Sequence, residues 1–224
     1  MLHHAARAVP WGRIALAAGL VVVLMELVRW NPWVLWPLQG TAVGLLAGAA
    51  AWCFDETAAA VADTSPRGLA WRAAARSPAV LLLILAWAFA VARLGNDATF
   101  GHLDAVRVQG LAAVAIGAAV ACWRRAQGEA SPGLLFAAVI VPVATVWALV
   151  RPLGDHLAVF PYGTTSSHGW HLSTIGWATA GVLAGLLLIA ALTDAPWWHL
   201  RRVPWLSERR RSFRRTGSTP GRGR

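Results

Sequence analysis

The sequence contains no lysine, since all 20 of its basic residues are arginines. A nucleotide-binding loop of the G-x-x-x-x-G-K-[ST] type therefore cannot be built from this chain. Charged residues make up 13% of the chain, against about 25% in an ordinary soluble domain, so a soluble fold is not expected. The two cysteines, Cys53 and Cys122, are too few and too far apart for a disulfide scaffold, and no C-x-x-C pair is available for metal or redox chemistry.

Apolar residues, by contrast, make up 57% of the chain. About 20 apolar helical residues cross the hydrocarbon core of a bilayer, and fewer suffice where flanking arginines reach the surface. We therefore predict an all-α, polytopic integral membrane protein with about six transmembrane helices. The third and fourth spans are short, which leaves open that one of them is re-entrant. The predicted spans are 14–28, 34–54, 79–92, 108–123, 133–150 and 169–192.

Arginines are distributed unevenly over the connections between these spans. With a cytoplasmic amino terminus, 16 arginines lie on the cytoplasmic side and four on the outer side. Because cytoplasmic connections retain arginine, both termini are predicted to lie in the cytoplasm, with the protein in the inner membrane of a bacterium. Residues 1–196 form the predicted transmembrane domain, with a cytoplasmic loop at 55–77. Residues 197–224 form a basic cytoplasmic tail that suits anionic lipid rather than nucleic acid.

Two of the predicted spans carry glycine at every fourth position, which lets another helix approach closely. Gly40, Gly44 and Gly48 lie in the second span, and Gly181 and Gly185 lie in the sixth. These spacings predict helix-packing faces. The pattern leaves open whether the faces meet inside one chain or join it to a second membrane subunit.

Glu26 is an acidic residue well inside a predicted span, and a residue of this kind is a candidate functional group. Arg29 lies three residues further on, on the same helical face. A structural ion pair near the outer surface is therefore the preferred interpretation. Gln39 and His171, which lie near helix ends, are predicted to be interfacial.

Three histidines, His156, His168 and His171, fall in or beside the outer loop before the sixth span. The spacing of the last two puts both imidazoles on one helical face, and Asp155 is a carboxylate that would complete a metal site. These residues are weak metal candidates. The chain shows no G-x-S-x-G elbow and no serine or cysteine beside an obvious base. We therefore predict no catalytic residues and no cofactor.

The predicted cytoplasmic loop reads DETAAAVADTSPRGLAWRAAARS from residue 55 to residue 77. Asp63, Thr64 or Ser65 is placed to cap a helix that has Pro66 at its first position. Leu69, Ala70, Ala73 and Ala74 are predicted to share one modestly apolar face of that helix. The pattern predicts a short amphipathic helix at the cytoplasmic surface. It either rests on anionic lipid or docks a cytosolic partner. The candidate docking residues are Asp63, Arg67, Leu69, Arg72, Ala73 and Arg76.

The run Ala49–Arg67, followed by Trp71-Arg72 and Arg76, resembles a group of small, lysine-poor membrane proteins of high-GC actinobacteria. In that group an apolar helix ends in a Phe-x-Asp-Asp/Glu element, and a helical stretch with a Ser-Pro step and arginines leads into the next span. The segments Arg151-Pro152 and Thr193–Pro196 resemble the last part of the same group.

The resemblance implies a membrane subunit of an ABC transporter that acts in export and is energised by a separate cytosolic ATPase chain. The 55–77 loop then corresponds to the coupling helix that enters a groove on the ATPase. With 224 residues the chain is short for an exporter permease, so an auxiliary subunit is an alternative within this class. Two other classes stay open: a membrane scaffold that assembles a larger complex and, third, a subunit of a membrane oxidoreductase.

Overall fold

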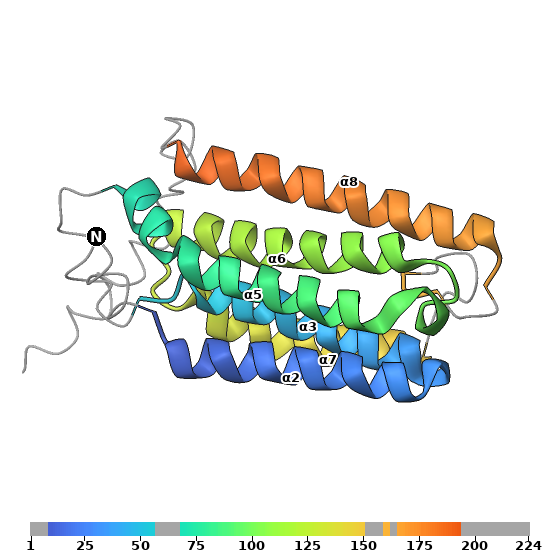
Figure 1. The fold of residues 1–224 in the computed structure, drawn as a ribbon. Coiled ribbons are helices and arrows are strands. Elements are labelled where there is room, and N and C mark those ends of the chain that lie inside the picture. Colours follow the sequence, from blue (N-terminus) through green and yellow to red (C-terminus); the bar gives the residue numbers. More distant parts are fainter. Residues whose placement is uncertain (1–8, 57–67, 151–158, 162–164, 194–224) are drawn as a thin grey trace, which may run out of the picture. The chain divides into compact units, whose positions relative to one another are not determined.

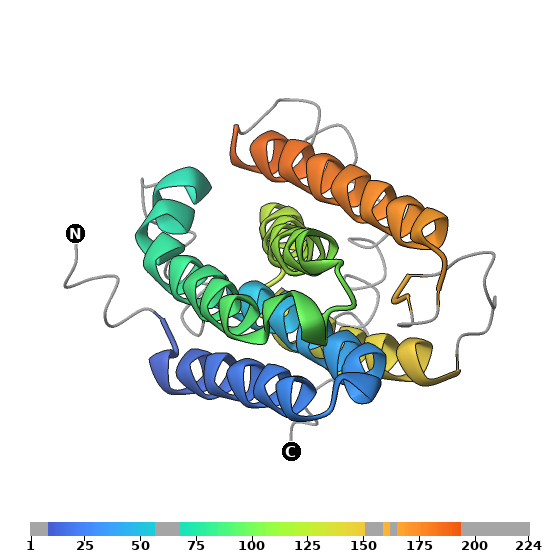
Figure 2. The ribbon, with the colours of Figure 1, turned by 45° about the vertical axis from the view of Figure 1, so that its right-hand side comes forward.

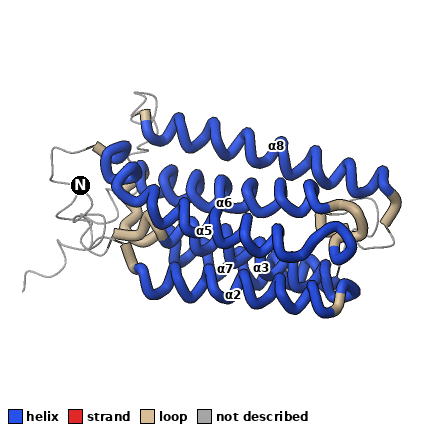
Figure 3. The backbone as a smooth tube through the Cα atoms, in the orientation of Figure 1, coloured by secondary structure: helices blue, strands red, loops and turns tan. Residues whose placement is uncertain are grey.

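The computed structural model describes residues 9–56, 68–150, 159–161 and 165–193. Most of these residues are helical, and no strand occurs among them (Figures 1 and 3). Among the described residues, six helices are long and apolar enough to cross a membrane, as the sequence predicted. They are α2 (Trp11–Trp30), α3 (Leu35–Trp52), α5 (Leu69–Ala98), α6 (Leu103–Ala126), α7 (Pro132–Val150) and α8 (Ser167–Leu192), with a 3-10 turn η1 (Pro32–Val34) before α3.

The third and fourth helices are longer than the predicted spans 79–92 and 108–123. Helix α5 has 30 residues and α6 has 24, so both are long enough for a full crossing and the short lengths predicted for them are wrong. The excess lies at both ends of each helix. There, arginines and polar residues extend the helix beyond the purely apolar run from which a span is predicted.

The separate amphipathic helix that the sequence predicted at the surface is also wrong from Leu69 onward. Helix α5 begins at Leu69 and continues through Pro78 into the predicted span. Arg72 and Arg76 lie within this helix, and both pair with Glu56 in the preceding connection. The predicted surface helix therefore forms the first turns of a helix that is long and apolar enough to cross a membrane.

Helix α3 lies at the centre of the bundle and packs against α7, α6 and α2 (Figure 2). Helix α6 packs in addition against α8 and α5, and α2 packs against α5. The coverage of the helices differs widely. Within the described residues, 67% of the α3 and α6 spans is buried, but only 6% of the α8 span is buried. Helix α8 is thus attached to the bundle chiefly along α6.

The glycine face of α3 is covered by α7 of the same chain. A Cβ atom on Gly44 would lie 3.0 Å from the Cβ of Ala144, and one on Gly48 would lie 3.0 Å from that of Ala137; Gly40 faces Ala148 in the same way. These glycines therefore pack inside the chain, which settles for α3 a question that the sequence left open.

In α8 the two predicted packing glycines differ. Gly181 faces Ala112 of α6, where a Cβ atom would lie 3.2 Å from the alanine Cβ. Around Gly185 nothing described lies within 4 Å of such an atom, so its predicted close approach is absent here. The sequence did not single out Gly117 of α6, yet it lies against the backbone of Ala47 more tightly than any of these.

Successive helices run in opposite directions, so the bundle has two distinct ends (Figure 1). The proximal end carries the start of α2 and the connections from α3 to α5 and from α6 to α7. The distal end carries the turns from α2 to α3 and from α5 to α6, and the start of α8. The arginine distribution predicts that the proximal end faces the cytoplasm. Asp63, Arg67, His156 and the 197–224 tail lie outside the described residues.

Candidate functional site

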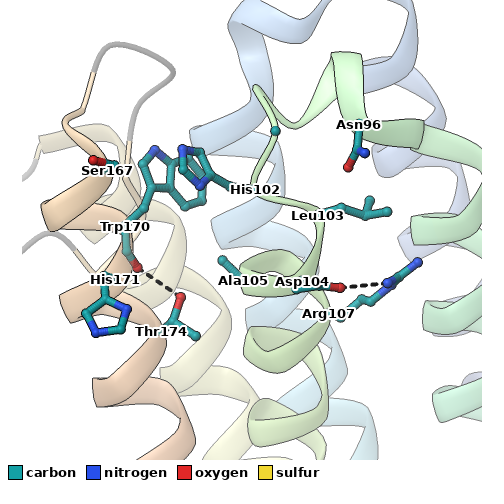
Figure 4. A pocket seen from close by; sticks show the side chains of 11 residues that line it. Asn96, His102, Leu103, Asp104, Ala105, Arg107, Ser167, Trp170, His171 and Thr174 are labelled. Carbon is teal, nitrogen blue, oxygen red and sulfur yellow. Dashed lines mark hydrogen bonds and ion pairs between the residues drawn. The ribbon is translucent and has the colours of Figure 1, made fainter.

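A pocket of about 630 Å³ opens at the distal end (Figure 4). It is formed by the end of α5, the turn from α5 to α6, and the first turns of α6 and α8. Its polar lining side chains include Asn96 from α5 and Thr174 from α8. Three helices, α5, α6 and α8, therefore contribute to one cavity, and concave sites of this kind are where proteins commonly bind small molecules.

The turn that leads into the pocket has an unusual backbone. Gly95 interrupts the helical conformation of α5 with φ 72°, and Gly101 has φ 82°. Phe100, between them, has φ 51°, which costs energy for a residue with a side chain. Its ring packs against Trp33 at 5.5 Å, and this contact helps to hold the turn. The strained turn places the next residue, His102, over the pocket.

His102 stacks on Trp170 of α8. The ring centroids are 4.4 Å apart and the planes differ by 12° (Figure 4). Trp170 is 1% exposed and anchors the first turns of α8. Burial lowers the pKa of His102 below its ordinary value of 6.5, so the imidazole is neutral near pH 7. This stack joins the α5–α6 turn to α8 at the edge of the pocket.

Charge at the pocket mouth is confined to one ion pair. Arg107 donates to Asp104 at 2.7 Å, one helical turn apart on α6 (Figure 4). Both side chains are more than half exposed, so the pair contributes little to stability. Within the described lining the charges thus cancel.

A chain of buried polar side chains lies one turn deeper than the pocket. The side-chain amide of Gln39 donates to Gln109, and the amide of Gln109 donates to Ser173 Oγ at 3.3 Å. The Ser173 hydroxyl in turn donates to the carbonyl oxygen of Val159 at 3.0 Å. Both glutamines are 0% exposed, so the prediction that Gln39 is interfacial is wrong. We call Gln39, Gln109 and Ser173 the polar relay.

The relay ends on a short buried segment of irregular backbone, Val159–Pro161. Trp177 donates its indole N–H to the Val159 carbonyl at 3.0 Å, so that carbonyl has two donors. Phe160 is 4% exposed and packs against the Trp177 ring at 5.7 Å. Backbone without helical hydrogen bonds is tolerated at such depth where protein covers it or where it lines a cavity.

The proximal end is organised around a single carboxylate, that of Glu56. Arg76 contacts it at 2.9 Å and Arg72 at 2.8 Å, and Arg125 of α6 donates to it through two nitrogens. The side chains of Arg76, Arg125 and Glu56 are 7%, 1% and 4% exposed. One buried carboxylate thus joins the α3–α5 connection to α5 and α6. We call these four residues the Glu56 cluster.

Neighbouring polar residues close the same end. Asp55 accepts hydrogen bonds from the backbone N–H groups of Gly133 and Leu134, at 2.6 and 3.0 Å, and so caps α7. Burial nevertheless raises the pKa of Asp55 above its ordinary value. The backbone N–H of Glu56 donates to the carbonyl oxygen of Ala130 at 3.1 Å. The α6–α7 turn is therefore tied to the same carboxylate-bearing segment.

The predicted docking residues lie largely inside this arrangement. Leu69 and Ala73 are 7% and 8% exposed, covered by their own chain, so the apolar face expected to be free for a partner is not free. Ala70 and Ala74, which were predicted on the same face, are exposed. The predicted apolar face is therefore divided, since the bundle covers Leu69 and Ala73 and leaves the two alanines uncovered.

Glu26 forms the predicted ion pair with Arg29 at 2.8 Å, and Arg93 of α5 joins it at the same distance. This triad ties α2 to α5 near the distal end. His168 and His171 are exposed on α8, and the described residues hold no group of three histidine, cysteine, aspartate or glutamate side chains able to bind a metal ion. A metal centre therefore gains no support from the described part of the chain.

Sequence reasoning missed both the polar relay and the Glu56 cluster. Gln109 lies within an apolar run, which is the signal that could have marked it, since an amide at membrane depth needs a partner. Comparison with protein-family models, with curated proteins and with solved structures found no match for this chain.

Proposed function

We propose that this chain is a transmembrane subunit, permease or auxiliary, of an ATP-driven transporter in a bacterial inner membrane. The observation that supports it best is the contrast between the two ends of the bundle. The distal end has a pocket of about 630 Å³ above a buried polar relay, and the proximal end is closed by the Glu56 cluster. A site accessible from one side and sealed on the other is the arrangement that a transport protein requires in one of its states.

In this proposal the two ends open in turn. The pocket exchanges solute on the outer side, and separation of the Glu56 cluster opens the proximal side to the cytoplasm. The resemblance of the 49–76 segment to actinobacterial transporter subunits favours export, with the pocket as the place of release. Anionic lipid around the basic tail and a second membrane subunit complete the proposed surroundings.

Energy would come from a cytosolic ATPase that docks at the proximal end. Because Leu69 and Ala73 are covered, the docking surface is assigned to the exposed face of Ala70 and Ala74 together with the exposed turn 126–131. A coupling surface made of the first turns of α5 would transmit ATPase movement directly to Arg72 and Arg76, and hence to the Glu56 cluster.

Co-purification from the native host tests this function. The full-length tagged chain, extracted in mild detergent, is expected to retain an ATPase chain that mass spectrometry identifies. Ala74→Asp is expected to reduce the retained ATPase by at least about tenfold, because a charge replaces a small residue at the centre of the contact. Asn31→Asp, which adds the same charge at the distal end, is the matched control. An unaltered chain that retains no ATPase would contradict the proposal.

A second candidate function is a scaffold that assembles a larger membrane complex. The observation that favours it is the sparse coverage of α8, of whose span 6% is buried. In that case the purified chain would carry other membrane proteins without an ATPase. Ala74→Asp would then leave the set of bound chains unchanged, which distinguishes the two functions in a single experiment.

A further inference from the structure

The polar relay contains an acceptor without a donor. Gln39 uses its amide nitrogen to contact Gln109, but its side-chain oxygen has no hydrogen-bond donor among the described residues although it is fully buried. A buried polar atom in this state costs about 1–3 kcal/mol. Such an atom in an apolar helix bundle marks a place where a group that donates a hydrogen bond would be stabilised.

The relay lies directly beneath the distal pocket. Ala105 lines the pocket, and Gln109 is one helical turn further along the same face of α6. On α8, Trp170 and Thr174 line the pocket on either side of Ser173 in the sequence. A solute in the pocket therefore needs to advance by about one helical turn, about 5 Å, to reach the relay.

The charge of the site limits what it can hold. Among the described residues a cation would reach the relay with no carboxylate beside it, since Asp104 is at the mouth and is already paired with Arg107. An anion would face the oxygen of Gln39 and the Val159 carbonyl, which both repel it. Leaving either ion unpaired in this interior is far more costly than leaving a neutral polar group there. The ligand is therefore neutral.

The hydrogen-bonding groups narrow the class further. The site offers an acceptor on Gln39 and donors on side-chain amides such as that of Asn96, so a ligand must both donate and accept. Hydroxyl groups do both. The site also contains an aromatic wall, Trp170, on which the apolar face of a sugar or cyclitol ring can lie in place of the His102 imidazole.

We propose that the distal pocket and the polar relay together bind a neutral, polyhydroxylated solute of the sugar or cyclitol class. This assignment rests on the proposed transport function and names its substrate class. A hydroxyl group of the solute donates to the side-chain oxygen of Gln39, and others exchange hydrogen bonds with Gln109 and Ser173. Uncharged polarity throughout the relay gives the preference over amino acids, quaternary amines and phosphorylated compounds.

Direct binding to the purified full-length chain tests the proposal, without any ATPase present. The probes are myo-inositol and glucose at millimolar concentration or below, compared with choline, glutamate and inorganic phosphate, by isothermal titration in detergent. We expect saturable binding of at least one neutral probe and none of the charged ones. Gln109→Met is expected to weaken that binding at least tenfold, and Ser173→Ala is the second relay variant in case Gln109→Met is poorly folded.

Gln127→Met, an amide removed from the exposed proximal turn, is the matched control and should bind as the unaltered chain does. Binding of a charged probe in preference to both neutral ones would overturn the assignment, and so would neutral binding that survives both relay variants, or no binding of either neutral probe. The transport function is judged separately by retention of the ATPase. An ATPase-bearing chain that fails this titration would contradict the substrate class alone.

Discussion

The two ends of the bundle use opposite chemistry to hold helices together. At the proximal end one buried carboxylate, Glu56, pairs with three arginines from two helices. At the distal end neutral amides and a hydroxyl form the relay, and the charged groups of the pocket stay near the surface. An ion-pair cluster thus holds the helices together at the proximal end, and a chain of neutral hydrogen bonds does so beside the distal pocket. In the proposed function, the proximal end stays shut while the distal end exchanges a ligand.

The Glu56 cluster also costs more free energy to disrupt than the polar relay does. Removing one partner from a buried ion pair costs about 3–5 kcal/mol because the remaining charge is left buried. Neutral hydrogen bonds contribute about 0.5–1.5 kcal/mol each, and the relay already leaves one acceptor unmatched. In the proposed function, movement of the ATPase separates a cluster of the first kind, whereas a relay of the second kind rearranges around a small solute.

The largest effect is expected from Glu56→Gln. This change removes the carboxylate shared by Arg72, Arg76 and Arg125, and we expect a loss of about 3–5 kcal/mol, seen as a fall in Tm on the order of 10 °C in detergent. The exposed distal pair provides the control, since Asp104→Asn should lower Tm by about 2 °C or less. If the two changes lowered Tm equally, the Glu56 cluster would stabilise the bundle no more than the exposed distal ion pair does.

An intermediate effect is expected from Gly117→Ala. A Cβ atom at this position would collide with the backbone carbonyl of Ala47, so α3 and α6 must move apart at a cost of about 1–3 kcal/mol. Gly185→Ala meets open space and should leave the melting temperature within about 1 °C of the original. If Gly185→Ala were as damaging as Gly117→Ala, α8 would have a partner at that position that the isolated chain does not show.

The smallest effect is expected from pH, through His102. Burial lowers the pKa of this imidazole, so between the lowered value and 6.5 the unfolded chain binds more protons than the folded one. The folded chain therefore has its full stability above about pH 6.5 and loses stability as the pH falls below that value. Because the ring is partly exposed, we expect a Tm decrease of about 1–2 °C.

His102→Phe is the appropriate variant for this measurement. It keeps an aromatic ring on Trp170 and removes the titrating group. The difference in Tm between the two chains should therefore be constant above pH 7 and shift in favour of His102→Phe below pH 6, when both are measured from pH 5 to pH 8. A difference that stays constant with pH would show that the stack acts by shape alone.

The sequence predicted the features that depend on local pattern. The runs of apolar residues located all six helices, and the spacing of Glu26 and Arg29 predicted their ion pair. Gly40, Gly44 and Gly48 marked a packing face that the structure confirms. Each of these depends on residues within a few turns of one helix, which periodicity describes well.

The features that the sequence could not predict depend on distant residues. Glu56 meets Arg125, which is 69 residues away, and Gln39 meets Gln109, which is 70 residues away. Periodicity identified the apolar face of Leu69 and Ala73, but it could not show that the chain's own helices cover that face. Which distant residues pair, and which helix faces are covered, depends on which helices become neighbours.

Labelling of the two native cysteines tests most directly whether the proximal end is closed. Cys53 and Cys122 are fully buried, and burial raises the pKa of the Cys53 thiol to about 12. They are therefore unreactive while the Glu56 cluster is intact. A third cysteine introduced by Thr174→Cys lies in the lining of the distal pocket.

Labelling with a membrane-impermeant maleimide, applied from either side of oriented vesicles, reports on both ends at once. We predict that the cysteine at position 174 reacts from the outer side only, while Cys53 and Cys122 react from neither side. Adding Glu56→Gln should make Cys122 reactive from the cytoplasmic side. Ready reaction of Cys122 in the chain that retains Glu56, or reaction at position 174 from the cytoplasmic side, would contradict the account of a sealed proximal end and an open distal one.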